Sequence, residues 1–132
     1  MPAELKWLLF TVILTGILWI PYILDRIVVR GLMGAMANPS PSDAAQSLWA
    51  QRLQNAHVNA VENLVIFASL VLLLNAIHVS TPTTIFACAL YFWARLVHAV
   101  VYMLGIPVVR TLAFTVGFVA QAMLALAALG MM

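Results

Sequence analysis

The sequence predicts an all-α membrane protein, a bundle of four transmembrane helices, and three observations lead to that class. Hydrophobic residues make up 65% of the 132-residue chain, charged residues make up only 8%, and the mean hydropathy is +1.08. A soluble domain is about 25% charged. The apolar residues also form runs long enough to cross a bilayer. We expect one domain, residues 1–132, in a multi-pass protein of a bacterial inner membrane.

The first expected span covers about residues 5–24. Its 18 residues from Trp7 to Leu24 carry no charge and reach the length that a transmembrane helix needs. The run is longer than a signal-peptide core and ends in Asp25-Arg26 instead of a small-residue cleavage site, so it is interpreted as a retained span. Pro21 is expected to kink its end, and the helix is expected to continue outside the lipid as far as Gly31.

A polar loop at about residues 37–50 follows, with turn-forming Asn-Pro and Ser-Pro pairs. Residues 51–60 are then expected to start a helix in water before that helix enters the membrane. The next stretch, residues 63–94, lacks Asp, Glu, Lys and Arg and is too long for one span. It is expected to break at residues 78–84, because Pro82 is tolerated in the first turn of a helix and a preceding Ser or Thr can cap that helix. The remaining spans are therefore expected at about residues 57–77, 82–104 and 108–129.

The distribution of basic residues predicts the orientation, because Lys and Arg favour the cytoplasmic side. Arg26, Arg30 and Arg52 flank the first loop, Arg110 follows the last turn, and the middle turn carries none. The first loop and last turn are thus expected in the cytoplasm and both termini on the opposite side, although Lys6 argues weakly against this. The net charge of +2 is too small and scattered to indicate nucleic-acid binding.

Ionisable residues inside spans are functional candidates because they are costly in lipid. On the second span, Arg52, Asn55, Asn59 and Glu62 are spaced by 3, 4 and 3 residues and share one helix face, close to His57. On the third span, Arg95, His98 and Tyr102 share a face in the same way, and Arg110 and Thr111 open the fourth span.

These clusters also have structural interpretations. Arg26, Arg30 and Arg52 are possible interfacial charges that only set orientation, and Glu62 and Arg95 are a possible structural ion pair between helices. A metal site is not expected, because the histidines and Glu62 form no compact ligand motif. Taken together, however, the clusters suit a small peptide-like ligand. Arg binds carboxylates through paired hydrogen bonds, and Glu62 suits an ammonium group.

Two segments carry a family resemblance. Residues 55–67, NAHVNAVENLVIF, resemble the R-x-H-x-N-x-x-E motif of the MAPEG family, the membrane proteins of eicosanoid and glutathione metabolism. Residues 94–111, ARLVHAVVYMLGIPVVRT, resemble that family's segment A-R-x-x-H-x-x-x-Y followed by an arginine. Arg30, followed eight residues later by Asn38-Pro39, is a third point of similarity, and the order of the three agrees over nearly the whole chain.

The resemblance implies a homotrimer that binds glutathione as a cosubstrate between neighbouring protomers, near the cytoplasmic end. It implies a transferase or peroxidase whose lipophilic electrophile enters from the lipid bilayer. Arg110 would be the catalytic residue facing the sulfur, with Thr111 beside it. The glutathione-binding residues would be Arg30, His57, Asn59 and Glu62 on one side and Arg95, His98 and Tyr102 from the adjacent protomer.

Three positions depart from the family pattern. Asn55 and Val58 stand where better-known members have arginines, and Phe114 stands where a tyrosine is frequent. The departures imply weaker carboxylate binding and low, altered or absent activity. Two alternatives therefore stay open: a catalytically silent accessory or structural membrane subunit of the same fold, and a small transporter with Arg95 and Glu62 along its path.

Overall fold

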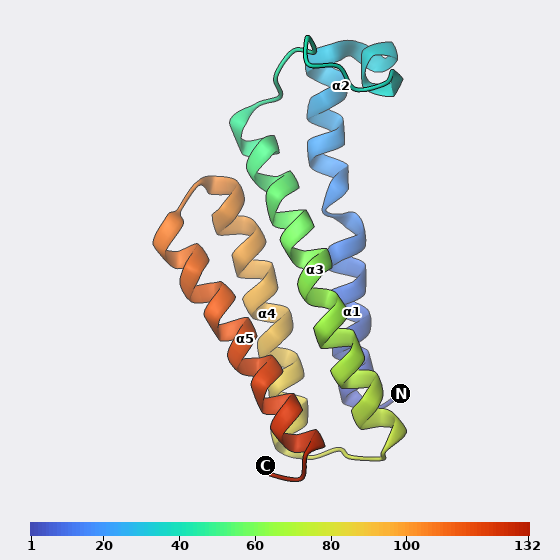
Figure 1. The fold of residues 1–132 in the computed structure, drawn as a ribbon, viewed down its shortest axis with the longest axis vertical. Coiled ribbons are helices and arrows are strands. Elements are labelled where there is room, and N and C mark those ends of the chain that lie inside the picture. Colours follow the sequence, from blue (N-terminus) through green and yellow to red (C-terminus); the bar gives the residue numbers. More distant parts are fainter.

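A computed structural model describes residues 1–132 and consists of helices and connecting turns (Figure 1). The helices are α1 (Ala3–Ile17), α2 (Trp19–Met36), α3 (Leu48–Ala76), α4 (Pro82–Leu104) and α5 (Pro107–Ala128). With α1 and α2 joined as one rod, the chain has four helical rods that are long and apolar enough to cross a membrane. The predicted all-α class with four membrane-length helices is confirmed.

The first rod is interrupted and extends further than the sequence indicated. The helix breaks at Leu18, three residues before Pro21, and α2 then continues beyond residue 24 to Met36. Proline causes a break of this kind because it lacks an N–H and its ring displaces the carbonyl of the preceding turn. Within α2, Gly31 has φ +74° and ψ 164°, a conformation that a glycine adopts at little cost. The last turns of α2 consequently bend across the axis of the rod (Figure 1).

The start of α3 is fixed by a contact with α2. The helix was expected to start in water at about residue 51, before the span that begins near residue 57, and it begins three residues earlier, at Leu48. Ser47 precedes it and donates both its hydroxyl and its backbone N–H to the carboxylate of Asp25, at 2.6 and 3.0 Å. Gln46 donates to the same carboxylate at 3.3 Å. The buried Asp25 thus ties the end of the polar loop to the first rod.

The two remaining turns have local causes in the sequence. At the start of α4, the Thr81 hydroxyl accepts the Thr84 N–H at 3.1 Å, and the Thr84 hydroxyl accepts the Thr81 N–H at 2.9 Å. This reciprocal cap confirms the expected role of a Thr before Pro82. Between α4 and α5, Gly105 has φ +77°, and a Cβ there would lie 3.2 Å from Cζ of Arg52. The α4–α5 turn therefore packs against the beginning of α3.

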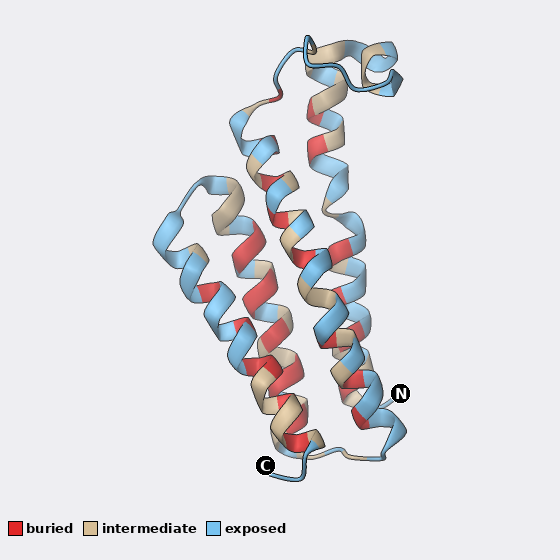
Figure 2. Cartoon of the chain, in the orientation of Figure 1, coloured by how far each residue is buried: buried red, intermediate tan, exposed pale blue.

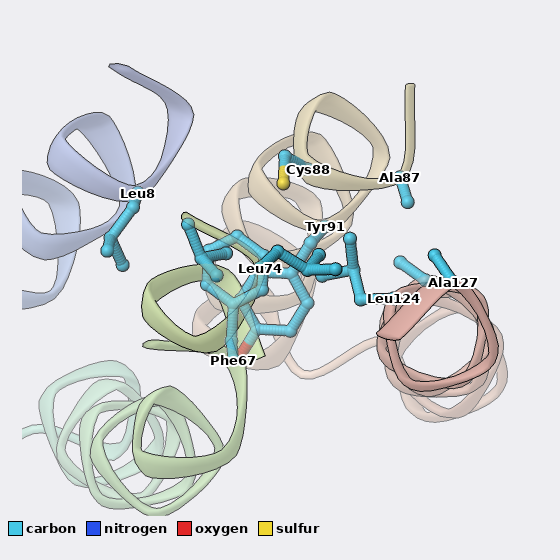
Figure 3. Close-up of a cluster of buried hydrophobic side chains, with 10 residues drawn as sticks. Leu8, Phe67, Leu74, Ala87, Cys88, Tyr91, Leu124 and Ala127 are labelled. Atoms are coloured by element: carbon cyan, nitrogen blue, oxygen red, sulfur yellow. The ribbon is translucent and has the colours of Figure 1, made fainter. Parts of the chain in front are cut away.

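The larger of two core clusters lies between the rods (Figure 3). The rings of Phe67 and Tyr91 stack at its centre with their centroids 3.9 Å apart. Between α4 and α5, small residues such as Ala94, Gly117 and Ala120 allow close packing. Buried residues follow the facing sides of the helices, and the outer sides are exposed and largely apolar, as expected for a bundle surrounded by lipid (Figure 2).

Candidate functional site

A polar groove of about 240 Å³ opens between α3, α4 and α5, toward the α4–α5 turn. Its lining residues are Asn59, His98, Tyr102, Arg110, Thr111 and Phe114. The first five belong to the set predicted from the sequence, and the sixth is one of the departures from the family pattern. The fold thus brings together residues of α3, α4 and α5 that are far apart in the sequence, from Asn59 to Phe114.

Arg95 lies behind this groove and is 4% exposed. Its Nη2 donates to Oδ1 of Asn59 at 2.7 Å, and its Nε has no hydrogen-bond partner. The only ion pair in the chain joins Arg30 to Asp43, so no carboxylate of the chain balances the Arg95 charge. A buried charge without a counter-charge is strongly unfavourable. The Arg95 charge is therefore not balanced within the chain.

His98 is 2% exposed and occupies the wall between Tyr102 and Phe114. The ring centroid of His98 lies 5.5 Å from that of Tyr102 and 6.3 Å from that of Phe114. Its Nδ1 has no partner in the chain. Because buried polar atoms are nearly always hydrogen-bonded, this nitrogen indicates a place for a polar ligand atom or a water molecule.

Arg110 and Thr111 place a cation and a hydroxyl at the beginning of α5. The Arg110 guanidinium lies 4.5 Å from the centroid of the Tyr102 ring, a cation–π contact that holds it against the groove wall. The Thr111 hydroxyl donates to the carbonyl of Pro107 at 3.3 Å, which leaves its oxygen able to accept a hydrogen bond. Arg110 is partly exposed and makes no ion pair, so its charge is available to a ligand.

Besides Arg95, three predicted residues do not line this groove: His57, Arg30 and Glu62. Nδ1 of His57 is hydrogen-bonded to the Tyr22 hydroxyl at 2.7 Å, between α3 and α2. Arg30 donates from Nε to the Ala44 carbonyl at 2.8 Å and lies 3.7 Å from Asp43, so it holds the polar loop. Arg30 also lines a second polar groove of about 450 Å³. This groove is lined by Arg26, Arg30, Ala35, Ala37, Pro39, Ala45, Gln46, Gln51 and Gln54.

Glu62 faces outward from α3. Its side chain is exposed and has neither a hydrogen bond nor an ion pair in the chain, so the suggested structural pair with Arg95 does not form. The apolar residues Val61 and Val65 beside it are 46% and 66% exposed. Within one chain Arg95 contacts Asn59 instead, whereas the resemblance implied that these two residues come from neighbouring protomers. Glu62 therefore has no charged partner within the chain.

An apolar groove of about 540 Å³ was not predicted from the sequence. It is lined by Asn63, Ile66, Leu70, Phe114, Phe118, Gln121, Ala122 and Ala125. Nε2 of the buried Gln121 donates to the Asn63 carbonyl at 3.2 Å across this groove. Phe114 lines both grooves, so the apolar groove begins where the polar one ends. Asn63, one turn after Asn59, and Gln121, isolated among apolar residues, are the sequence signals that point to it.

These features define a multi-pass membrane protein with a polar groove, lined by one arginine, in a four-helix bundle. The model of the MAPEG family matches residues 5–130, nearly the whole chain, and the protein belongs to the MAPEG family. The resemblance seen in the sequence is thereby confirmed. The family is a four-helix membrane bundle and includes glutathione-using transferases as well as other members. Comparison with curated proteins and with solved structures found no match.

Proposed function

We propose that this protein is a glutathione-dependent membrane transferase or peroxidase that acts on lipophilic electrophiles. The observation that carries the proposal is the sharing of Phe114 between the two grooves. One groove presents Arg110, His98 and Asn59, and the other presents almost only apolar side chains. Glutathione bound in the polar groove and a lipophilic molecule bound in the apolar groove would meet beside Phe114.

The polar groove suits the chemistry of glutathione, which carries two carboxylates, an ammonium and a thiol. Arg95 and His98 have nitrogen atoms without partners, and the Arg95 charge has no counter-ion, as a site for an anionic ligand requires. In the proposed site Asn59, Arg95, His98, Tyr102 and Thr111 hold the cosubstrate, and Arg110 faces its sulfur. A cation beside a thiol favours the thiolate, which is the nucleophilic form.

Arg30, His57 and Glu62 complete the proposed site from outside the groove. Since Arg30 lines a separate groove and Glu62 faces outward, the glutathione molecule must extend beyond one chain to reach them. This requirement supports binding between protomers, with Glu62 receiving the ammonium. Binding between protomers would also account for the fact that only part of the predicted glutathione-binding residues line one groove of a single chain.

The protein is expected to assemble as a homotrimer. A charge at the centre of a span costs about 2.5–3.5 kcal/mol on insertion scales, and a subunit interface would cover Glu62 and its exposed apolar neighbours. Native mass measurement of the detergent-solubilised protein gives the subunit number. A stable monomer or dimer would contradict this expectation.

The polar loop is expected to face the cytoplasm, with both termini on the other side. A Ser42→Cys variant should then resist an impermeant thiol reagent added to intact cells, because Ser42 lies in that loop. Met132→Cys, at the exposed C-terminal end, is the matched control that should label readily. The native Cys88 is buried and gives little background. Labelling of Ser42→Cys but not of Met132→Cys would show the opposite orientation and contradict this prediction.

The activity is tested directly with detergent-purified protein. Glutathione conjugation to a hydrophobic electrophile, or reduction of a lipophilic hydroperoxide by glutathione, is the expected result. Glutathione binding without turnover would favour a catalytically silent accessory subunit. Solute flux through vesicles that contain the protein, without glutathione binding, would favour a small transporter.

A further inference from the structure

Another polar cavity, of about 240 Å³ and separate from the grooves described above, lies at the end of the bundle opposite the polar loop. It is lined by Pro2, Glu4, Leu74, Asn75, His78, Val79 and Ser80. These residues come from the beginning of α1, the end of α3 and the α3–α4 turn, which lie together with both termini (Figure 1). The cavity shares no lining residue with the groove that contains Arg110.

The central feature of this cavity is the carboxylate of Glu4, which is 4% exposed. Its Oε1 accepts hydrogen bonds from the hydroxyls of Ser80 and Thr84, each at 2.7 Å. Glu4 stands in the first turn of α1, and Thr84 stands in the first turn of α4. The amino-terminal ends of helices carry partial positive charge, so two helices stabilise a negative charge at this position.

No cation of the chain pairs with that carboxylate. The only ion pair joins Arg30 to Asp43 at the far end, and neither Lys nor Arg lines the cavity. His78 also lines the cavity, but it makes no ion pair with Glu4. Oε2 of Glu4 makes no hydrogen bond, because both donors bind Oε1. The last turn of α3, which contributes Asn75, carries the partial negative charge of a helix end and has no basic residue. The cavity therefore offers hydrogen-bond acceptors and negative charge without a fixed cation.

We propose that this cavity binds a primary ammonium group. An ammonium has three N–H donors, which match Oε2 of Glu4, the Asn75 side-chain oxygen and the Ser80 hydroxyl. A metal ion is a poorer match, since no group of three His, Cys, Asp or Glu side chains is placed to hold one. A quaternary ammonium is also a poorer match, because it has no N–H and is usually held by Trp, Tyr or Phe rings, and none of these residues lines the cavity.

The end of a membrane-length bundle lies at the level of the lipid headgroups. A primary ammonium can reach the cavity there either from the ethanolamine headgroup of a phospholipid or from a small free amine. The two sources share the same chemistry. They differ in whether the ammonium must be attached to a lipid in the same bilayer.

The proposal is tested by thermal unfolding of the intact protein in nanodiscs. Discs of phosphatidylcholine alone are compared with discs that also contain phosphatidylethanolamine, and with phosphatidylcholine discs to which ethanolamine is added. Either source should raise the melting temperature of the wild-type protein, because a ligand that binds only the folded state stabilises it. A rise with the lipid alone identifies the headgroup, and a rise with free ethanolamine identifies a small amine.

Glu4→Gln should weaken the apparent affinity for the amine by about tenfold or more, because a hydrogen bond to a charged group becomes a neutral one. Asp43→Asn removes one carboxylate charge at the other end of the bundle and should respond like the wild type. If Glu4→Gln fails to fold, Asn75→Leu removes an acceptor without touching the Glu4 hydrogen bonds and should also reduce the response. An unchanged wild-type melting temperature with both amines, or equal shifts in all variants, would overturn the proposal.

Discussion

Replacing Glu62 with Gln is expected to weaken glutathione binding by a factor of about a hundred to a thousand, equivalent to ~3–4 kcal/mol. The substitution keeps the shape of the side chain and removes its charge. Glu62 has no cationic partner within the chain, so in the proposed site the ammonium of glutathione is its only counter-charge. Breaking a buried charge pair from one side has a large effect because the other charge stays buried and unpaired.

Calorimetric titration of the detergent-purified variant with glutathione measures this loss. Native mass measurement must show that the variant assembles like the wild type, because misassembly would also abolish binding. A correctly assembled Glu62→Gln protein with wild-type affinity would remove Glu62 from the site.

Arg110→Leu is expected to separate glutathione binding from thiol activation. Binding should persist, since the carboxylates and the ammonium have other partners in the proposed site. A free thiol has a pKa near 8.5, and a neighbouring cation lowers this to about 7 or below. Without Arg110, the thiolate fraction at neutral pH, and with it the conjugation rate, should fall by about tenfold or more.

The ultraviolet absorbance of bound thiolate and the pH dependence of the rate check this prediction. The thiolate signal should be lost at neutral pH and recovered as the pH rises, and the rate should recover with it. The midpoint of the rate profile should consequently move to higher pH in Arg110→Leu. Arg110→Lys keeps the charge but loses the planar group that stacks on Tyr102, so it should retain part of the activity. Normal thiolate signal and rate in correctly assembled Arg110→Leu would refute the assignment.

The length of the apolar runs and the turn residues predicted most of the fold. The start of α4 was predictable because its cap is local, formed by Thr81 and Thr84 around Pro82. A kink near Pro21 and a helical start before the second span were expected, but the positions of the break at Leu18 and of the first residue of α3 at Leu48 were not. The first depends on where a proline disrupts the turn before it, and the second depends on Asp25, which is far from Ser47 in the chain.

The candidate site was predictable to the extent that helix periodicity places residues on one face. That rule grouped His98 with Tyr102, and both line the polar groove. It does not say which faces of different helices meet. The pairing of His57 with Tyr22 and the attachment of Arg30 to the polar loop therefore appeared only in three dimensions. Gln121 was missed for the same reason, because its partner is a backbone carbonyl on α3.

The break at Leu18 divides the first rod into two segments that are attached to different parts of the molecule. The first segment, α1, is attached to α4 through the hydrogen bond of Glu4 with Thr84 and the packing of Trp7 on Phe92. The second segment, α2, is attached to the polar loop at the start of α3 through Asp25. One membrane-length rod therefore belongs to two packing units, with α1 in the core at the end that holds the termini and α2 beside the loop that Arg30 contacts.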